Sequence, residues 1–405
     1  MTHRHVHVAF CLLALAFSGV AAPAQPTDEA GRSLITNFLP RDYKRHSQMW
    51  SATQVADGLL YFANRGAVLE FDGRTWSAIP VSNTFVHRVA LAPDGHIYVC
   101  GPDLIGRLER KADRRFEFRS LLDLVPAEVK PLGSIASIAV HDGAVFFGSS
   151  VVLRWRDGAF RIWKQPVSGL NSVNAVGKNL FLARPGEGLF RWTGDDFAPI
   201  QKPDQPRPAG AEAIALTAAY AEDPTADAVI FTSDGHAVRI RGDRSERWEL
   251  PASTAAVFSQ LRPRVAVRLA DGTLAVGTTT AGVFLLDSKG TIFRRIDERS
   301  GLENQRVLGL FEDRESSLWV LTHNGAARVE VGTPATLFDR ANGLGGEAVS
   351  AFVRHRGVLY AGSSGLYRLE PGDPVQGRPA RFEKFRWVLV SERASSLFTR
   401  IVTVC

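Results

Sequence analysis

The sequence has few residues that could crosslink the chain or hold a metal ion. Only three of its 405 residues are cysteines, Cys11, Cys100 and Cys405, and no Cys-x-x-Cys pair is present. The seven histidines after residue 24 stand singly, without the spacing of zinc ligands. These absences exclude a disulfide framework, and we expect no metal and no cofactor. Cys100 alternates with apolar residues in a strand-like stretch, so we predict a buried free thiol there.

Long apolar runs are also missing after the first residues of the chain. Arg4 and three histidines precede a short apolar run, Val8–Val20, which is followed by Ala22-Pro23-Ala24. This order is typical of a secretory signal peptide cleaved after Ala24. No later stretch reaches the roughly 18 apolar residues of a membrane helix. We therefore expect a mature chain that is exported to the periplasm and has no membrane span.

Neither a strong charge bias nor a catalytic motif is present. Removing Arg4 with the leader lowers the formal net charge from +6 to +5. Without a stripe dense in Lys and Arg, nucleic acid is not an expected partner of an exported chain, whereas an anionic ligand is compatible with this charge. The sequence contains no nucleophile elbow, HExxH motif, phosphate-binding loop or kinase signature. It therefore gives no motif-based reason to expect an enzyme.

What the chain has in abundance is one repeated pattern. A strand, an Asp-Gly-type turn, a strand ending in small residues, a second turn and a third strand recur eight times, and an aromatic residue often follows. From Gly58 to Gly357 the repeats are spaced by about 43 residues. This period, with four short strands per unit, predicts an all-β fold, a β-propeller of four-stranded blades. A β-sandwich with fortuitous spacing is the alternative.

The number of units does not fit the expected ring directly. We favour seven blades, but eight repeat units are present, so either the ring has eight blades or the last unit opens a second propeller. The expected domains are the signal peptide 1–24, a short extension 25–36, the propeller 37–340, the eighth unit 341–388 and an irregular tail 389–405. The tail lacks a turn where one is due, as a truncated receptor would; an independent soluble binding protein is the other interpretation.

Two segments resemble the two-component-regulator propeller repeat. In the first, the matching residues are Gly301, Leu302, Asn304, Val307, Phe311, Glu312, Asp313, Leu318, Trp319, Thr322, Gly325 and Arg328, with departures at Ser317 and Leu321. The second, Asn37–Trp76, is similar to the opening blade of such sensors. The resemblance covers about residues 35 to 370. It implies an exported ligand-sensing domain whose full-length relatives are membrane-anchored receptors ending in a histidine kinase, a diguanylate cyclase or a DNA-binding module.

Five residues are candidates for ligand binding. Arg88, Arg264 and Arg306 each stand just before the innermost strand of a repeat. In a propeller these strand starts line the mouth of the central channel, where guanidinium groups would suit a carboxylate or sulfate. Solvation of the rim, or pairing with loop acids, is the alternative. Tyr43 and Trp50 could stack on a sugar ring, although Trp50 could instead pack between blades.

Together these observations favour a non-enzymatic, ligand-sensing propeller of a bacterial signal-transduction receptor, without its output domain. The expected ligand is a small molecule or a saccharide, with an anion as one candidate. One alternative is an exported propeller enzyme, a glycan lyase or hydrolase, for which Glu70, Glu187 and Tyr98 are weak candidates. Another is a protein-interaction scaffold. Single histidines in turns and the acids of Asp-Gly pairs are expected to be structural.

Overall fold

The computed structural model describes residues 29–112, 115–164, 169–184, 187–200, 213–218, 228–232, 235–333, 335–345 and 348–385, with 213–218 described as backbone only. The expected signal peptide, the expected tail and Cys405 lie outside these residues. Within them the chain forms eight four-stranded antiparallel sheets, and the predicted all-β propeller architecture is confirmed. No described helix is both long and apolar enough to cross a lipid bilayer.

Seven sheets, blades 1 to 7 in chain order, surround one axis. Blade 1 contains β2 (Ala52–Gln54), β3 (Leu60–Ala63), β4 (Arg65–Phe71) and β5 (Trp76–Phe85). Blade 2 contains β6 (Arg88–Leu91), β7 (Ile97–Gly101), β8 (Leu104–Arg110) and β9 (Phe116–Ser120). Blade 3 contains β10 (Ser137–His141), β11 (Ala144–Gly148), β12 (Val152–Arg156) and β13 (Ala159–Trp163). Blade 4 contains β14 (Ser172–Val176), β15 (Asn179–Arg184), β16 (Gly188–Trp192) and β17 (Phe197–Pro199). Blade 5 contains β18 (Ala213–Ala218), β19 (Ala228–Thr232), β20 (Ala237–Arg241) and β21 (Arg244–Trp248). Blade 6 contains β22 (Pro263–Arg268), β23 (Leu274–Thr278), β24 (Val283–Leu286) and β25 (Ile292–Ile296). Blade 7 contains β26 (Val307–Glu312), β27 (Ser317–Thr322), β28 (Gly325–Glu330) and β1 (Ile35–Phe38). The helices are α1 (Pro40–Tyr43) and α2 (Ala252–Leu261), with 3-10 turns η1 (Leu122–Leu124), η2 (Ala127–Val129), η3 (Glu298–Ser300) and η4 (Arg340–Asn342).

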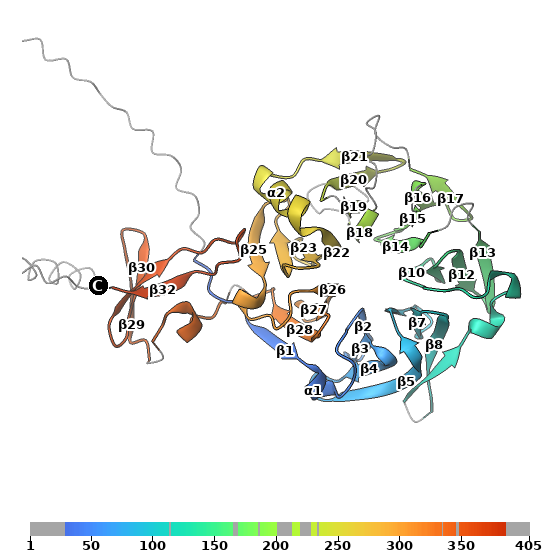
Figure 1. Ribbon diagram of the computed structural model, residues 1–405, viewed down its shortest axis with the longest axis horizontal. Coiled ribbons are helices and arrows are strands. Elements are labelled where there is room, and N and C mark those ends of the chain that lie inside the picture. The colour runs from blue at the N-terminus through green and yellow to red at the C-terminus, as the bar shows by residue number, and fades with distance from the viewer. Residues whose placement is uncertain are drawn as a thin grey trace, which may run out of the picture.

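The ring is closed by the two ends of the propeller sequence. The innermost strands β2, β6, β10, β14, β18, β22 and β26 contact one another in cyclic order, from blade 1 round to blade 7 and back (Figure 1). The outermost strand of blade 7 is β1, which pairs antiparallel with β28 from Ile35–Val329 to Phe38–Ala326. The blade-forming segment thus starts at Ile35, two residues before the boundary drawn from the sequence.

The eighth sheet lies beside the ring and not in it (Figure 1). It contains β29 (Ala351–His355), β30 (Val358–Gly362), β31 (Leu366–Glu370) and β32 (Arg381–Lys384). The N-terminal segment before β1 attaches it: the Ala380 N–H donates to the Ala30 carbonyl at 2.9 Å, and Arg32 forms a bridge with Leu337. One segment therefore contacts both the ring and the eighth sheet.

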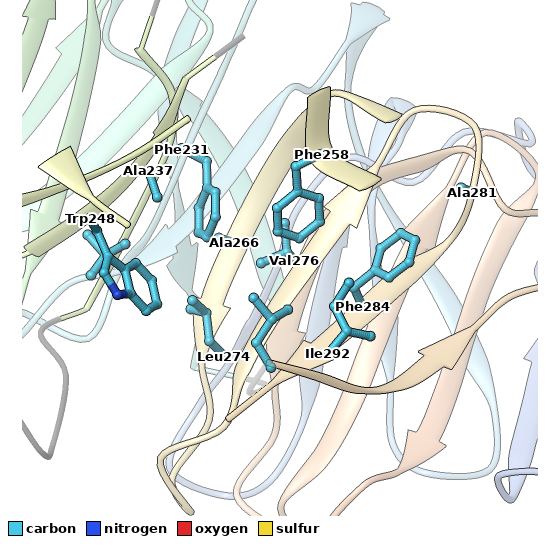
Figure 2. Packing of buried hydrophobic residues seen from close by; sticks show 12 residues of the cluster. Phe231, Ala237, Trp248, Phe258, Ala266, Leu274, Val276, Ala281, Phe284 and Ile292 are labelled. Carbon is cyan, nitrogen blue, oxygen red and sulfur yellow. The ribbon is translucent and has the colours of Figure 1, made fainter. Parts of the chain in front are cut away.

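Turns and packed sheet faces explain why the repeat folds this way. Between β10 and β11, Asp142 and Gly143 both have positive φ, 47° and 69°, as a tight two-residue hairpin requires. Between blades 5 and 6, Phe258 of α2 packs edge-on against Phe231 and Phe284, with ring centroids 5.5 and 5.7 Å away (Figure 2). Each blade thus buries its apolar faces on its neighbours.

The segment that resembles the family repeat is held by one acidic residue. Asp313 follows β26, and its carboxylate accepts hydrogen bonds from the Ser317 N–H at 2.8 Å and the Trp319 indole N–H at 2.8 Å. Glu312 accepts from the Ala270 N–H of blade 6. The Glu-Asp pair therefore fixes a tight turn, positions a buried tryptophan and links two blades.

Candidate functional site

The three predicted arginines occupy the same position in three blades. Arg88 begins β6, Arg264 is the second residue of β22, and Arg306 immediately precedes β26. Arg88 and Arg264 are half-buried and Arg306 is exposed. Because β6, β22 and β26 are innermost strands, all three arginines lie beside the ring axis. Whether they bind a ligand stays a prediction.

Their charges act on one another across the ring. Burial lowers the pKa of Arg88, and the charge of Arg264 lowers it further, while the nearby Cys100 thiol raises it. Burial likewise lowers the pKa of Arg264, and the charge of Arg306 adds to this effect. Blades 2, 6 and 7 thus direct positive charge to one region from which water is partly excluded.

No carboxylate among the described residues forms an ion pair with these arginines. Nη1 of Arg88 donates to the His87 carbonyl at 2.9 Å and to the Trp50 carbonyl at 3.4 Å, so its remaining N–H groups have no partner in the described part of the chain. Unneutralised guanidinium groups in a poorly solvated region favour an anion.

Tyr43 is not part of this region. It ends α1, is only 6% exposed and donates its hydroxyl hydrogen to the Ser47 carbonyl at 3.1 Å. Its ring packs 5.6 Å from that of Trp76, in the apolar cluster shared by blades 7 and 1. Burial raises its pKa. Tyr43 is therefore a core residue, and the stacking role suggested by the sequence is wrong for it.

Trp50 packs between blades, as one of the two interpretations of the sequence had it, and its stacking on a ligand stays a prediction. It packs against the apolar cluster between blades 1 and 2, yet part of it is exposed. Its ring lies 5.1 Å from the His87 ring and 6.3 Å from the Phe85 ring. Its indole Nε1 is buried and has no hydrogen-bond partner among the described residues. A buried donor without an acceptor is rare in native structures, where an ordered water or a ligand atom supplies the missing acceptor.

Histidines that sequence reasoning treated as isolated gather beside Trp50. The centroid of the His46 ring lies 5.3 Å from that of Phe85, and the guanidinium of Arg65 lies over the Phe85 ring, 5.2 Å from its centroid. Gln48 hydrogen-bonds to His323 of blade 7, whose backbone N–H donates to the Arg306 carbonyl at 3.1 Å. This face cluster contains His46, Gln48, Trp50, Arg65, Phe85, His87, Arg88, Arg306 and His323.

The face cluster comes from three neighbouring blades. Arg65 and Phe85 pair at the ends of β4 and β5, His87 immediately precedes β6, Arg88 begins it, and His323 lies in the β27–β28 hairpin. In each case the residue stands at the strand end that faces the connection between blades. That shared position, in the connection that leads into an innermost strand or at the hairpin between the second and third strands of a blade, is the signal that could have grouped them from the sequence.

The weak enzyme candidates lie in different blades and bond locally. Glu70 accepts from the Tyr61 hydroxyl at 2.7 Å, and Tyr98 donates to Asp94 at 2.8 Å. Glu187 accepts from Arg184 at 3.3 Å. Each pair stays within one blade, and no group of three or more potential metal ligands exists among the described residues.

Comparisons with known proteins extend the description of the fold. No protein-family model and no curated protein matches the chain. Solved structures described as extracellular domains of the hybrid two-component systems BT3049 and BT4673 from B. thetaiotaomicron are similar, with TM-scores of 0.61 and 0.59 and 15% sequence identity. The similarity covers 87% and 89% of this chain but 49% and 48% of those chains. Virginiamycin B lyase from Staphylococcus aureus is similar over 74% of this chain and 98% of its own, with a TM-score of 0.57 and 14% identity.

These similarities show a shared propeller fold. Extracellular domains of two-component systems are among the similar structures, in agreement with the resemblance seen in the sequence. The chain spans about half the length of those domains.

Proposed function

We propose that this chain is the ligand-sensing β-propeller of a bacterial signal-transduction receptor and acts outside the cytoplasm without catalysing a reaction. Two findings support the proposal. Similar folds occur in extracellular domains of two-component systems. The amino-terminal sequence has the order of a secretory signal peptide.

The buried, unpartnered indole N–H of Trp50 is the observation that carries the proposal. It lies among aromatic rings that can pack on a ligand and beside arginines that can hold it. Aromatic side chains with one polar handle suit ligands that have both a flat face and an oxygen acceptor. The face cluster therefore has the features of a binding site.

The proposal can be tested by screening neutral and acidic mono- and oligosaccharides, and small organic anions, for a shift in the melting temperature of the mature chain. The informative variant is Trp50→Phe, because it keeps an aromatic ring in the core but removes the Nε1–H donor. For any ligand found, we expect affinity to fall about fivefold, the effect of one lost hydrogen bond worth roughly 1 kcal/mol. Phe293→Ala, an exposed aromatic on β25, is the control and should bind normally.

Two results would contradict the proposed function. One is the absence of any stabilising compound in the panel. The other is a ligand that binds Trp50→Phe as tightly as the wild type, because the site would then lie elsewhere.

An enzyme is the competing proposal, since a lyase shares the fold. The mature chain should leave the panel compounds chemically unchanged on prolonged incubation, as judged by mass spectrometry. Conversion at ordinary enzyme rates, lost when the face cluster is mutated, would favour the enzyme.

A further inference from the structure

The face cluster contains three arginines and three histidines. Each of its three histidines lies close to an arginine: His46 to Arg65, His87 to Arg88 and His323 to Arg306. No described carboxylate forms an ion pair with any of them. His46 and His87 therefore face cations and aromatic rings, and no described acid pairs with them.

We propose that the face cluster binds an anion and that His46 and His87 take up protons when it binds, so that the ligand is held more tightly at lower pH. The inference rests on the proposed function and assigns that binding site a ligand class and a response to acidity. The shared chemistry is a carboxylate, sulfate or phosphate group. Guanidinium and imidazolium groups, together with the free indole N–H, are its natural partners.

The surroundings of His87 come from four elements. Arg88 follows His87 at the start of β6, and Trp50, whose ring packs on that of His87, precedes β2. Phe85 ends β5, and its ring centroid lies 6.5 Å from that of His87. From the connection that precedes β10, the Ile135 carbonyl lies 3.4 Å from Nδ1 of His87. The charged group that acts on the His87 ring is thus the Arg88 guanidinium, and the His87 backbone N–H donates to the Cys100 carbonyl at 2.7 Å.

The surroundings of His46 are similar in kind. Its ring packs on Phe85, and its Nδ1 accepts from the Gln48 N–H at 3.2 Å. Arg65 of β4 and His323 of the β27–β28 hairpin are the charged or titratable groups that act on it. Its carbonyl accepts from the Asn64 amide at 2.8 Å, which fixes the backbone of the segment.

These surroundings favour the neutral form of both histidines when no anion is present. Burial lowers the pKa of His46, and the charges of Arg65 and His323 lower it further. Burial also lowers the pKa of His87, the bond to the Ile135 carbonyl opposes this, and Arg88 adds to the lowering. An anion beside the arginines cancels part of their repulsion and raises both pKa values.

The sign of the effect on binding follows from proton linkage. If the bound state carries more protons than the free state, affinity rises as the pH falls through the histidine range. One proton taken up strengthens binding by up to about tenfold per pH unit. Two histidines acting together would double the slope of log affinity against pH.

The test uses sulfate as the probe, because its charge does not change in this range. The mature chain, isotopically labelled at its histidines, is titrated with sodium sulfate at constant ionic strength, at about pH 5.5 and about pH 7.5. The histidine resonances are followed by NMR. We expect roughly tenfold or tighter binding at the lower pH, and a raised pKa for His46 and His87. His141 is the matched control: burial lowers its pKa too, but it lies at the end of β10, beside Asp142, and no described arginine contributes to its pKa.

Variants assign the effect to named residues. Arg88→Gln should abolish the sulfate-induced shift at His87, and the double variant His46→Gln, His87→Gln should bind sulfate with little dependence on pH. His141→Gln should behave as wild type. The proposal is overturned if sulfate does not bind, if it binds equally at both pH values, or if His141 shifts as much as His87.

The two proposals fail in different ways. If a neutral compound binds at Trp50 while sulfate does not bind, the receptor function stands and the proton-linked anion site is wrong. If sulfate binds as described but no compound of the panel does, the anion site stands and the sensory role loses its support.

Discussion

Asp313 offers a sharp test of how the repeat motif stabilises a blade. Its side chain is 2% exposed, and it accepts from the buried Ser317 N–H, the buried Trp319 indole N–H and the Glu315 N–H. Replacing Asp313 with Ala removes the acceptor and leaves the first two donors buried and unpaired. Ser317 and Trp319 are 0% and 1% exposed, so water cannot replace the carboxylate without opening the turn.

The expected cost follows from the number of stranded donors. Each buried, unsatisfied N–H costs about 1–3 kcal/mol, so Asp313→Ala should lower the free energy of unfolding by about 2–6 kcal/mol. Asp313→Asn should lower the free energy of unfolding by less, because the amide oxygen can still accept from the turn while the NH₂ group faces the indole donor. Asp271→Ala is the control. That exposed acid accepts from the Thr273 N–H at 2.8 Å, and its loss should cost about 0.5–1.5 kcal/mol.

Urea denaturation followed by tryptophan fluorescence and by far-ultraviolet circular dichroism measures the order of these variants. We expect Asp313→Ala to be the least stable, then Asp313→Asn, then Asp271→Ala. If Asp313→Ala and Asp271→Ala agreed within about 0.5 kcal/mol, the Trp319 and Ser317 bonds would contribute nothing that water cannot supply, and the reasoning would be refuted.

Three further outcomes are expected. Cys100 is fully buried with its pKa raised to about 12, so in a Cys405→Ser background it should resist thiol reagents until the protein unfolds; rapid labelling of the native protein, or a Cys100–Cys405 bridge in the wild type, would contradict this. Phe258→Ala should cost about 3–5 kcal/mol in denaturant titrations, whereas Phe293→Ala, 42% exposed, should cost less than about 1 kcal/mol. Because three described histidines have pKa values below the ordinary 6.5, the unfolded chain binds more protons than the folded one, and the melting temperature in sulfate-free buffer should fall as the pH drops below about 6.5; an unchanged melting temperature would contradict the lowered values.

The propeller was predictable because its information is local and repeated. Asp-Gly turns, small residues after the second strand and a constant spacing recur from blade to blade, so one ambiguous unit is corrected by its neighbours. The sequence could not show that the eighth unit stands apart, because it matches the others in pattern and differs only in what it packs against. Closure by β1 was hidden for a related reason: a strand of four residues has no signal that names its partner.

The candidate site was predictable only where the repeat register reaches it. Arg88, Arg264 and Arg306 could be aligned because each precedes an innermost strand. Tyr43 was misjudged, since an aromatic residue near a blade reads the same whether it packs inward or outward. His46 and His323 were missed because nearly 280 residues of sequence separate two side chains that the ring closure brings to one face.

The strand that completes blade 7 also sets an order on folding. Arg32 pairs with Asp339 across 307 residues of sequence, and β1 cannot pair until β28 has formed. Contacts of such long range slow folding, so ring closure should be its last and slowest step. Until then β28 presents an unpaired edge, a template for strands of other copies. Recovery of native protein on refolding should therefore fall as concentration rises, and a chain lacking residues 25–38 should associate through that open edge.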